Sequence, residues 1–408
     1  MKRYVIAGCS DRALDMFAKP IVANFSNYAR LVGIFDPNHK RMEFFNQQLK
    51  TSIPAYTDFQ EMLKEQKPDC VIVTTIDCYH HQYIIASLKA GVDVISEKPM
   101  TIDEEKCRAI LAAEKESGKK VTVTFNYRHA PYCTKAKELL RQGKVGKILS
   151  IHFEWMLDTR HGADYFRRWH RRKENSGGLL VHKATHHFDL VNWFLEDEPD
   201  VVFAFGSRRF YGPTRRERGE RCLTCKYKKT CEFYWDITRA GEKMKGLYLD
   251  AEAVDKYYRD GCVFSSEIDI EDTMSVNVRY RQGTFLNYSL IAHSPYEGWK
   301  MSINGTGGRL ELEEYHSGNR ASEPFHYIRC YDREENSVTY EFIKPTGGHG
   351  GGDERLLRML FVNDLPDPLG LMADSRAGAM SILIGIAANK SIARGKPVEV
   401  SGLLKPSG

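Results

Sequence analysis

The sequence predicts an α/β protein, with an N-terminal, doubly wound parallel sheet followed by an α+β domain that carries a largely antiparallel open sheet. Two observations predict this fold class. Short apolar runs alternate with helical patterns up to residue 126, and from about residue 270 strand patterns follow one another with only short turns between them. Alternating strands and helices are typical of a parallel sheet, whereas successive strands indicate an antiparallel one. We therefore expect one domain over residues 1–126 and a second over residues 127–408.

Five apolar, β-branched runs predict the strands of the first sheet. Such runs are typical of strands that are buried on both faces. They cover residues 3–8, 31–36, 70–75, 92–97 and 121–126. Helical patterns lie between them, notably at residues 81–91 and 102–118, and the first of these ends on a glycine that is placed as a C-cap.

The second domain begins with an amphipathic helix and a long strand. The stretch VHKATHHFDL, residues 181–190, is then expected on one continuous helix behind Gly177 and Gly178. Residues 210–262 are charged and lack apolar periodicity, which predicts an insertion. The remaining elements of the domain are the first helix (133–146), the first strand (148–157), later strands (within 273–293, 300–314, 327–332 and 338–343) and a long closing helix (375–395).

The composition excludes several classes of protein. The chain has 408 residues, of which 42% are hydrophobic and 28% charged, as is ordinary for a globular protein of two or three domains. A net charge of +5 does not indicate a nucleic-acid surface, and no apolar run is long enough for a membrane span. The apolar stretch before Cys9 is too short for a signal peptide. We therefore expect a cytoplasmic protein with mostly reduced cysteines and with no nucleic-acid or membrane partner.

The loop after the first predicted strand is similar to a dinucleotide-binding fingerprint. Gly8, Ser10 and Ala13 stand at the G-x-G-x-x-G/A positions, so only the first glycine is kept, and a plain strand–helix turn explains the motif about as well. Asp36 favours the cofactor interpretation, because it ends the second strand near the expected spacing of ~20 residues and suits a carboxylate that accepts ribose hydroxyls.

An acidic residue at this place favours NAD, because a carboxylate repels the 2′-phosphate of NADP. Arg41 keeps NADP as the alternative cofactor. The residues expected to bind the cofactor are Gly8, Ser10, Asp11, Arg12, Ala13, Asp36 and Glu97.

The fourth strand ends in Glu97, Lys98 and Pro99. These residues are expected at the carboxyl edge of the sheet, where doubly wound folds bind ligands. Most lysines in loops are merely solvated, but a place beside the cofactor favours a function for Lys98 in binding and catalysis.

Together, these motifs resemble the Gfo/Idh/MocA oxidoreductases. The tripeptide at residues 97–99, the sequence FNYRHAP at 125–131 and the Gly-Gly helix carry the resemblance, which covers nearly the whole chain. The resemblance implies an N-terminal NAD(P) domain, a C-terminal α/β domain with an open sheet, and sugar or cyclitol substrates. It also implies homodimers or homotetramers that form through that sheet.

The same resemblance assigns roles to single residues. Lys98 falls on the family's catalytic lysine, His186 on its catalytic histidine and Asp189 on the last aspartate of the helix motif. His182 replaces an aspartate, which departs from the family's pattern and puts its usual Lys/Asp/His arrangement in doubt. Ala184 replaces a glycine, and Lys183 and His187 are additions.

These residues suit the oxidation of a secondary alcohol. Such a reaction needs a base for the hydroxyl proton and a cation for the developing alkoxide, while the nicotinamide carries the hydride. We expect His186 to transfer the proton, Lys98 to stabilise the oxygen, and His182, one helical turn before His186, to assist on the same face. Metal binding by His182, His186 and Asp189, and plain structural packing of the histidines, are the alternatives.

A basic, aromatic segment before the Gly-Gly pair supplies candidate substrate contacts, because sugars are bound by hydrogen-bond donors and aromatic faces. A solvated basic loop is the alternative. The residues expected to bind substrate are His161, Tyr165, Arg168 and Trp169, together with Lys98, His182 and Asp189. Within the glycine-rich segment 345–354, residues 348–354 predict a mobile loop whose His349 and Asp353 close over the substrate; a purely geometric role of these glycines is the alternative.

Four cysteines of the insertion, Cys222, Cys225, Cys231 and Cys262, permit a structural zinc site. Their spacing is not that of a standard zinc finger, and free thiols or a disulfide are the alternatives.

The leading hypothesis is an NAD-dependent oxidoreductase that transfers hydride between the cofactor and a secondary hydroxyl of a sugar, polyol or glycoside. One alternative is a redox-neutral, NAD-dependent glycoside hydrolase or lyase, in which a held cofactor takes up the hydride and returns it. A non-catalytic NAD-binding sensor is the other.

Overall fold

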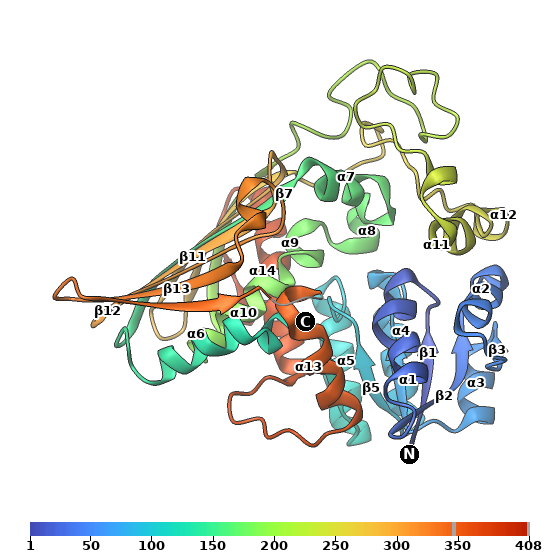
Figure 1. Ribbon diagram of the computed structural model, residues 1–408, viewed down its shortest axis with the longest axis horizontal. Coiled ribbons are helices and arrows are strands. Elements are labelled where there is room, and N and C mark those ends of the chain that lie inside the picture. The colour runs from blue at the N-terminus through green and yellow to red at the C-terminus, as the bar shows by residue number, and fades with distance from the viewer. Residues whose placement is uncertain (345–347, 406–408) are drawn as a thin grey trace.

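Figure 1 shows the computed structural model of the chain, which describes residues 1–344 and 348–405. Two sheets form its framework within these residues. Sheet A has seven strands in the order β15-β6-β5-β4-β1-β2-β3, and sheet B has nine in the order β14-β13-β12-β11-β7-β10-β9-β8-β16. The predicted fold class is confirmed, because sheet A is parallel except for β15 and sheet B is antiparallel except for the β7–β10 pair.

All five strands expected in sheet A are present. They are β1 (Lys2–Ala7), β2 (Ala29–Phe35), β4 (Cys70–Val73), β5 (Asp93–Ser96) and β6 (Val121–Val123). A two-residue strand, β3 (Ala55–Tyr56), extends the sheet at the β2 edge and was not expected, because two residues are too short to show periodicity.

Helices connect these strands. Several begin at a side chain that accepts hydrogen bonds from the first turn, such as Asn38 before α2 and Asp103 before α5. The connecting helices are η1 (Ala13–Ala18), α1 (Lys19–Ala23), α2 (His39–Leu49), α3 (Phe59–Gln66), η2 (Asp77–Tyr79), α4 (His80–Lys89) and α5 (Glu104–Ser117).

The chain returns to sheet A near its C-terminal end. Helix α13 (Gly352–Phe361) places Phe361 against Tyr4, with ring centroids 5.2 Å apart. The short strand β15 (Ala373–Asp374) then pairs antiparallel with β6. Segments far beyond residue 126 therefore complete the N-terminal sheet.

Sheet B is built mainly from the predicted run of hairpins. Strand β8 and the two-residue β16 were not expected. Its strands are β7 (Ile148–Asp158), β8 (Pro199–Ser207), β9 (Thr273–Tyr280), β10 (Phe285–Ser294), β11 (Gly298–Gly305), β12 (Gly308–Tyr315), β13 (Phe325–Asp332), β14 (Ser337–Ile343) and β16 (Val398–Glu399).

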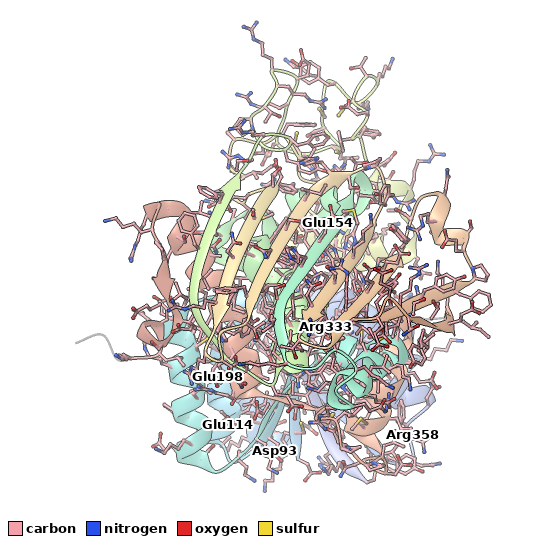
Figure 2. The ribbon with its side chains drawn as sticks, turned by 90° about the vertical axis from the view of Figure 1, so that its left-hand side faces the viewer. Asp93, Glu114, Glu154, Glu198, Arg333 and Arg358 are labelled. Atoms are coloured by element: carbon pink, nitrogen blue, oxygen red, sulfur yellow. The ribbon has the colours of Figure 1, made fainter. Side chains whose placement is uncertain are left out.

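Helices cover one face of sheet B and leave the other to solvent. The covering helices are α6 (Pro131–Arg141), α10 (Thr185–Leu195) and α14 (Ser375–Arg394). In Figure 2 sheet B is seen from its outer side, where Glu154 of β7 lies exposed. The strands alternate buried and exposed residues accordingly, as along β9.

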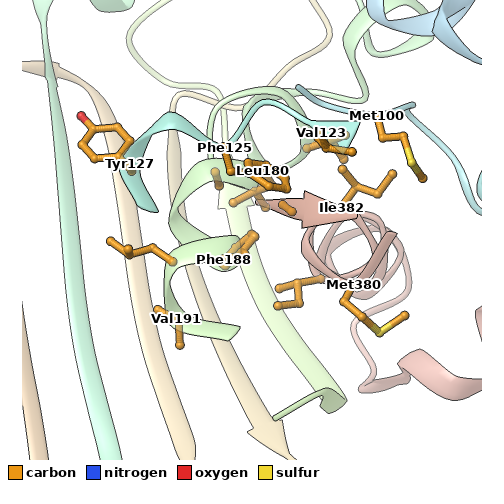
Figure 3. Packing of buried hydrophobic residues seen from close by; sticks show 14 of the residues in the cluster. Met100, Val123, Phe125, Tyr127, Leu180, Phe188, Val191, Met380 and Ile382 are labelled. Carbon is orange, nitrogen blue, oxygen red and sulfur yellow. The ribbon is translucent and has the colours of Figure 1, made fainter. Parts of the chain in front are cut away.

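The hydrophobic core is continuous between the two domains. Figure 3 shows Val123 and Phe125, at the end of β6, packed with Leu180, Phe188 and residues of α14. All of these side chains are nearly inaccessible to solvent. The core therefore fixes the position of the histidine-bearing segment relative to sheet A.

That segment is not the single helix that the sequence predicts. Helix α9 (Leu179–His182) ends before α10 begins, and Lys183 and Ala184 form a widened turn between them. The backbone N–H groups of both residues donate to the carbonyl of Leu179. The expectation of one continuous helix is therefore wrong, and the simple one-turn relation between His182 and His186 does not hold.

The insertion contains loops and four short helical segments, η5 (Ile237–Arg239), α11 (Glu242–Met244), η6 (Lys245–Leu249) and α12 (Glu252–Asp255). Tyr211 stacks on Phe166, with ring centroids 4.2 Å apart, and so packs the insertion against the second domain. Within the described parts of the chain, none of the helices has both the length and the apolar character needed to cross a membrane.

Candidate functional site

A cleft of about 1740 Å³ runs along the carboxyl edge of sheet A. One wall consists of the loops that follow β1, β2, β4 and β5. The opposite wall consists of α7 (Thr159–Arg167), the residues just after it, His182, and part of the insertion. Ligands of doubly wound sheets bind at this edge, so the cleft is the candidate active site.

The loop after β1 fits a dinucleotide. Gly8 has φ +99°, and a Cβ there would lie 2.8 Å from the backbone nitrogen of Thr75, so only glycine lets the two backbones approach. Ser10 accepts a hydrogen bond from the N–H of Ala13, which begins η1. Gly8, Ser10, Asp11 and Arg12 line the cleft, whereas Ala13 is buried beneath it.

Asp36 lies in the cleft at the end of β2. Its carboxylate accepts hydrogen bonds from the backbone N–H groups of Cys9 (2.9 Å) and Asn38 (2.8 Å). Arg41 Nη1 lies 3.6 Å from Asp36 Oδ1. Burial raises the pKa of Asp36, and the charge of Arg41 together with the two N–H groups opposes this shift.

Glu97 and Arg12 form an ion pair inside the cleft. Arg12 Nε donates to Glu97 Oε1 at 2.8 Å, and Arg12 Nη1 lies 3.7 Å from Asp353 Oδ2. Asp353 in turn lies 3.1 Å from the ring of His349 and accepts a hydrogen bond from Asn126. His349 and Asp353 thus reach the cofactor edge. The expected loop, residues 348–354, instead holds the short turn η8 (His349–Gly351) and the start of α13.

Lys98 lies half-buried in the same cleft. Burial lowers the pKa of its ammonium, while the carboxylates of Glu97 and Asp77 oppose this shift. A cation with a lowered pKa can stabilise an oxyanion and can also release its proton.

Asp77, which the sequence analysis missed, bonds to His182 at the edge of the cleft. Oδ2 of Asp77 lies 2.5 Å from Nδ1 of His182. Asp77 follows the strand β4, and a polar residue just beyond a buried strand at the carboxyl edge was the signal that could have identified it. The pair resembles the carboxylate–imidazole pairs in which the acid orients the ring.

His182 is surrounded by other polar rings. The ring of His170 lies 4.1 Å away and that of Tyr165 lies 5.6 Å away, centroid to centroid. Burial, followed by the neighbouring His170 and Lys98, lowers the pKa of His182 well below its ordinary value. Burial raises the pKa of Asp77, against the opposing charge of Lys98. The imidazole is therefore neutral near pH 7 and ready to accept a proton.

His186 and His187 lie deeper, outside the lining of the cleft. His186 packs against Tyr127 and His349, each 5.5 Å away between centroids, and its Nδ1 has no hydrogen-bond partner among the described residues. His187 stacks on Trp155 at 3.8 Å. Burial lowers the pKa of both imidazoles, as does the nearby charge of Lys98.

Lys183, at the turn between α9 and α10, is also buried. Its Nζ lies 4.8 Å from the centroid of the Trp155 ring, a cation–π contact. Burial lowers its pKa to about 8.

Asp189 does not lie where a substrate ligand is expected. Both of its oxygens accept hydrogen bonds from Arg128, at 2.5 and 2.7 Å, and the pair is buried away from the cleft lining. Arg128 pairs with both carboxylate oxygens, so Asp189 holds α10 against residues 126–129.

Three of the four substrate candidates in the basic segment line the cleft, namely Tyr165, Arg168 and Trp169. Arg168 also contacts Asp164, with Nη1 3.1 Å from Oδ2. His161 does not line the cleft; its Nδ1 lies 2.9 Å from Glu297, and its ring stacks on Tyr165 at 5.2 Å. His161 therefore supports Tyr165 from behind.

The four cysteines of the insertion border one small cavity. Arg167 donates to the sulfur of Cys222 at 3.1 Å, and Arg215 to that of Cys231 at 2.9 Å. Across residues 1–344 and 348–405, no three His, Cys, Asp or Glu side chains are grouped closely enough to hold a metal ion. Zinc binding by these thiols stays a prediction, and so does metal binding by His182, His186 and Asp189.

Comparison with known proteins gives matches over nearly the whole chain. Residues 2–125 match the family model described as "Oxidoreductase family, NAD-binding Rossmann fold", and residues 137–400 match "Oxidoreductase family, C-terminal alpha/beta domain". The Bacillus subtilis (strain 168) protein YteT, named only as an oxidoreductase, is 40% identical over 99% of both chains.

Two more distant matches are informative. An inositol 2-dehydrogenase/D-chiro-inositol 3-dehydrogenase of Lactiplantibacillus plantarum is 26% identical over 38% of this chain and 42% of its own. The crystal structure of the WlbA dehydrogenase from Bordetella pertussis, in complex with NADH and UDP-GlcNAcA, superposes with a TM-score of 0.67 at 17% identity and covers 98% of each chain. This last likeness shows a shared fold.

Proposed function

Because the chain belongs to the Gfo/Idh/MocA oxidoreductase family, we propose that it is an NAD-dependent enzyme that transfers hydride between the cofactor and a secondary hydroxyl of a sugar, polyol or glycoside. One observation carries this proposal: Lys98, Asp77 and His182 meet in the cleft that also contains the dinucleotide loop. A cation, a carboxylate and an imidazole supply what alcohol oxidation needs besides a hydride acceptor.

The loop after β1 and the end of β2 fit the cofactor. Gly8 leaves room for a pyrophosphate against the backbone, and Asp36 is a carboxylate at the ribose position of the fingerprint. When bound, the nicotinamide supplies the hydride acceptor or donor. Asp36 supports NAD over NADP. Arg41, the cation beside it, is already paired with carboxylates and so is not free to bind the 2′-phosphate of NADP.

The side chains of the chain itself handle the proton. We take Asp77 as ionised, because the ammonium of Lys98 opposes the rise that burial causes in its pKa. Nδ1–H of His182 then donates to the carboxylate and Nε2 keeps its lone pair. As the substrate is oxidised, its O–H bond breaks toward Nε2 while the carbonyl forms, and Lys98 stabilises the negative charge on that oxygen. Reduction runs through the same steps in reverse.

His186 is the second candidate for the proton-transfer residue. Its Nδ1 has no partner among the described residues, and the charge of Lys98 reaches its ring. His182 is favoured because it lines the cleft and has a carboxylate that stabilises its protonated form.

Tyr165, Arg168 and Trp169 are proposed to bind the substrate. They bring aromatic rings and the N–H donors of a guanidinium to the lining of the cleft, and such a combination suits a polyhydroxylated ligand.

We also propose a cytoplasmic homodimer or homotetramer that forms through the outer face of sheet B. All ten cysteines are free, as is typical of a reducing compartment. The outer face carries apolar side chains beside charged ones; Phe205 is 66% exposed and Phe285 54% exposed. Light scattering of the purified protein measures the oligomeric state directly.

The test is to purify the protein, identify any bound nicotinamide and its redox state, and assay polyols, sugars and glycosides with and without added NAD. Turnover that reduces one NAD per substrate supports the proposal. Lys98→Met should abolish it, because methionine keeps the length of the side chain and removes the charge. If neither Lys98→Met nor His182→Ala changes a detected activity, the assignment of the site is wrong.

Glycoside cleavage without added NAD would instead support the redox-neutral alternative. The insertion residues that line the cofactor end of the cleft favour that alternative, because they hinder release of the cofactor, and a cofactor that returns its hydride does not have to leave. Binding of NAD without any turnover would indicate a sensor.

A further inference from the structure

The second half of the insertion lies against the cofactor-binding edge of sheet A. In Figure 1 the chain descends from the loops at the top to α11 and α12, which lie above α2. This stretch, residues 242–257, contains α11, η6 and α12, and we call it the clamp segment. Nothing in its sequence predicts this position.

Lys243 attaches the clamp segment to the first turn of the dinucleotide-binding fold. Its Nζ lies 2.6 Å from Oδ1 of Asp11 and 2.5 Å from Oδ2 of Asp15. Asp11 belongs to the loop that fits the pyrophosphate. All three side chains are more than a third exposed, so these pairs contribute little stability and act mainly by holding the segment in place.

Apolar packing attaches its middle. Leu247 is fully buried in the same core cluster as Met42, Phe44 and Phe45. A Cβ at Gly246 would collide with the ring of Phe44, so the backbone of the segment lies directly on α2. Contacts of this kind fix the segment on the first domain although its chain connections are to the second.

Asp255 attaches its end, beside Asp36. Asp255 Oδ2 lies 2.5 Å from Arg41 Nη2 and accepts a hydrogen bond from Asn38 Nδ2 at 2.9 Å. The same guanidinium lies 3.6 Å from Asp36 through Nη1 and donates through Nε to the carbonyl of Leu247 at 3.1 Å. Arg41 is therefore paired from three directions.

From these contacts we infer that Asp255 is a cofactor-specificity residue and that the clamp segment retains NAD in the cleft against exchange and against NADP. The inference rests on the proposed function. Tyr248, Val254, Asp255 and Tyr257 line the cleft together with Asp36, so the segment forms its outer wall at this end.

The charges explain the selection. A phosphate group brought to Asp36 would meet a second carboxylate, that of Asp255, and like charges in a partly buried site repel strongly. Arg41, which could otherwise bind the phosphate, is neutralised by the two carboxylates. Ribose hydroxyls carry no charge and can donate to either carboxylate.

The test compares the wild-type protein with Asp255→Asn by titrating NAD and NADP separately into protein freed of cofactor. Asparagine keeps the shape of the side chain and its acceptor oxygen but removes the charge. We expect the ratio of NADP affinity to NAD affinity to rise on the order of 10-fold, because one repulsive charge is lost and Arg41 is released. The dissociation rate of NAD should also rise, as should that of Lys243→Ala.

Asp250→Asn is the matched control, because Asp250 lies exposed in the same segment. It should leave both affinities unchanged. Suppose that the wild-type protein prefers NAD but that Asp255→Asn changes neither the affinity ratio nor the dissociation rate of NAD. This result would overturn the inference and leave the proposed function intact. Failure of the wild-type protein to bind either dinucleotide would overturn the proposed function as well.

Discussion

Helices α9 and α10 carry neighbouring histidines with opposite surroundings. His182, at the end of α9, lines the cleft and bonds to a carboxylate. His186, in the first turn of α10, is enclosed by the aromatic rings of Phe125 and Tyr127 and by His349. The widened turn at Lys183 and Ala184 separates the two environments. Neighbouring histidines therefore differ in role because different elements pack against them. For His182 the partner is the acid Asp77, which follows β4.

The largest effect is expected when the histidine of α9 is removed. His182→Ala should lower kcat on the order of 10³-fold, because the proton acceptor is lost, while NAD affinity changes little. Steady-state kinetics with a cofactor titration measure both. A greater loss in His186→Asn than in His182→Ala would reverse the assigned roles.

A smaller loss is expected when the partner acid is neutralised. Asp77→Asn should lower kcat on the order of 10²-fold, since the amide neither fixes the ring tautomer nor stabilises the imidazolium. Because the pKa of His182 is lowered by burial, the wild-type activity should fall only below pH 6.5, as the imidazole gains a proton. Without the carboxylate the protonated ring is less stable still, so this acid limb should move to lower pH in the kcat profile. An acid limb that moves to higher pH would contradict the pairing.

The histidine of α10 should matter less for the reaction. His186→Asn should lower kcat by about 10-fold or less, because the ring contacts neighbouring rings and lies outside the cleft lining. Thermal unfolding measured beside the kinetics separates a loss of stability from a loss of chemistry.

The smallest effect on turnover is expected further along α10. Asp189→Asn leaves the buried guanidinium of Arg128 without its counter-ion, so the free energy of unfolding should fall by about 3 kcal/mol. The kcat of the folded fraction should stay unchanged. Denaturant unfolding measures the free energy of unfolding, and activity per folded protein measures kcat. A large fall in kcat would show that Asp189 takes part in the reaction or in substrate binding.

The sequence predicted most of the first domain because its strands are apolar, β-branched and alternate regularly with helical patterns. It also predicted the places of Gly8, Asp36 and Lys98, since these follow from the ends of those strands. Asp77 was missed although it follows a buried strand at the carboxyl edge, because that position alone gives it no role; its role comes from the contact with His182, far along the chain. The break between α9 and α10 was missed because Lys183 and Ala184 are both acceptable helix residues.

The clamp segment was missed for a related reason. Its three helical turns are too short for periodicity, and its position depends on Leu247 and Asp255 finding partners more than 200 positions earlier in the sequence. Strands of two residues, such as β3 and β15, carry no pattern at all.

The late return of the chain to sheet A sets an order of events during synthesis. Strand β6 has its outer neighbour only when β15 is available, and Tyr4 has its aromatic partner only when Phe361 is available. Emerging N-terminal domains usually fold first on the ribosome. Here the first domain leaves the ribosome with the edge of β6 unpaired and the apolar surface around Tyr4 uncovered. Its sheet is completed only after most of the polypeptide has been synthesised.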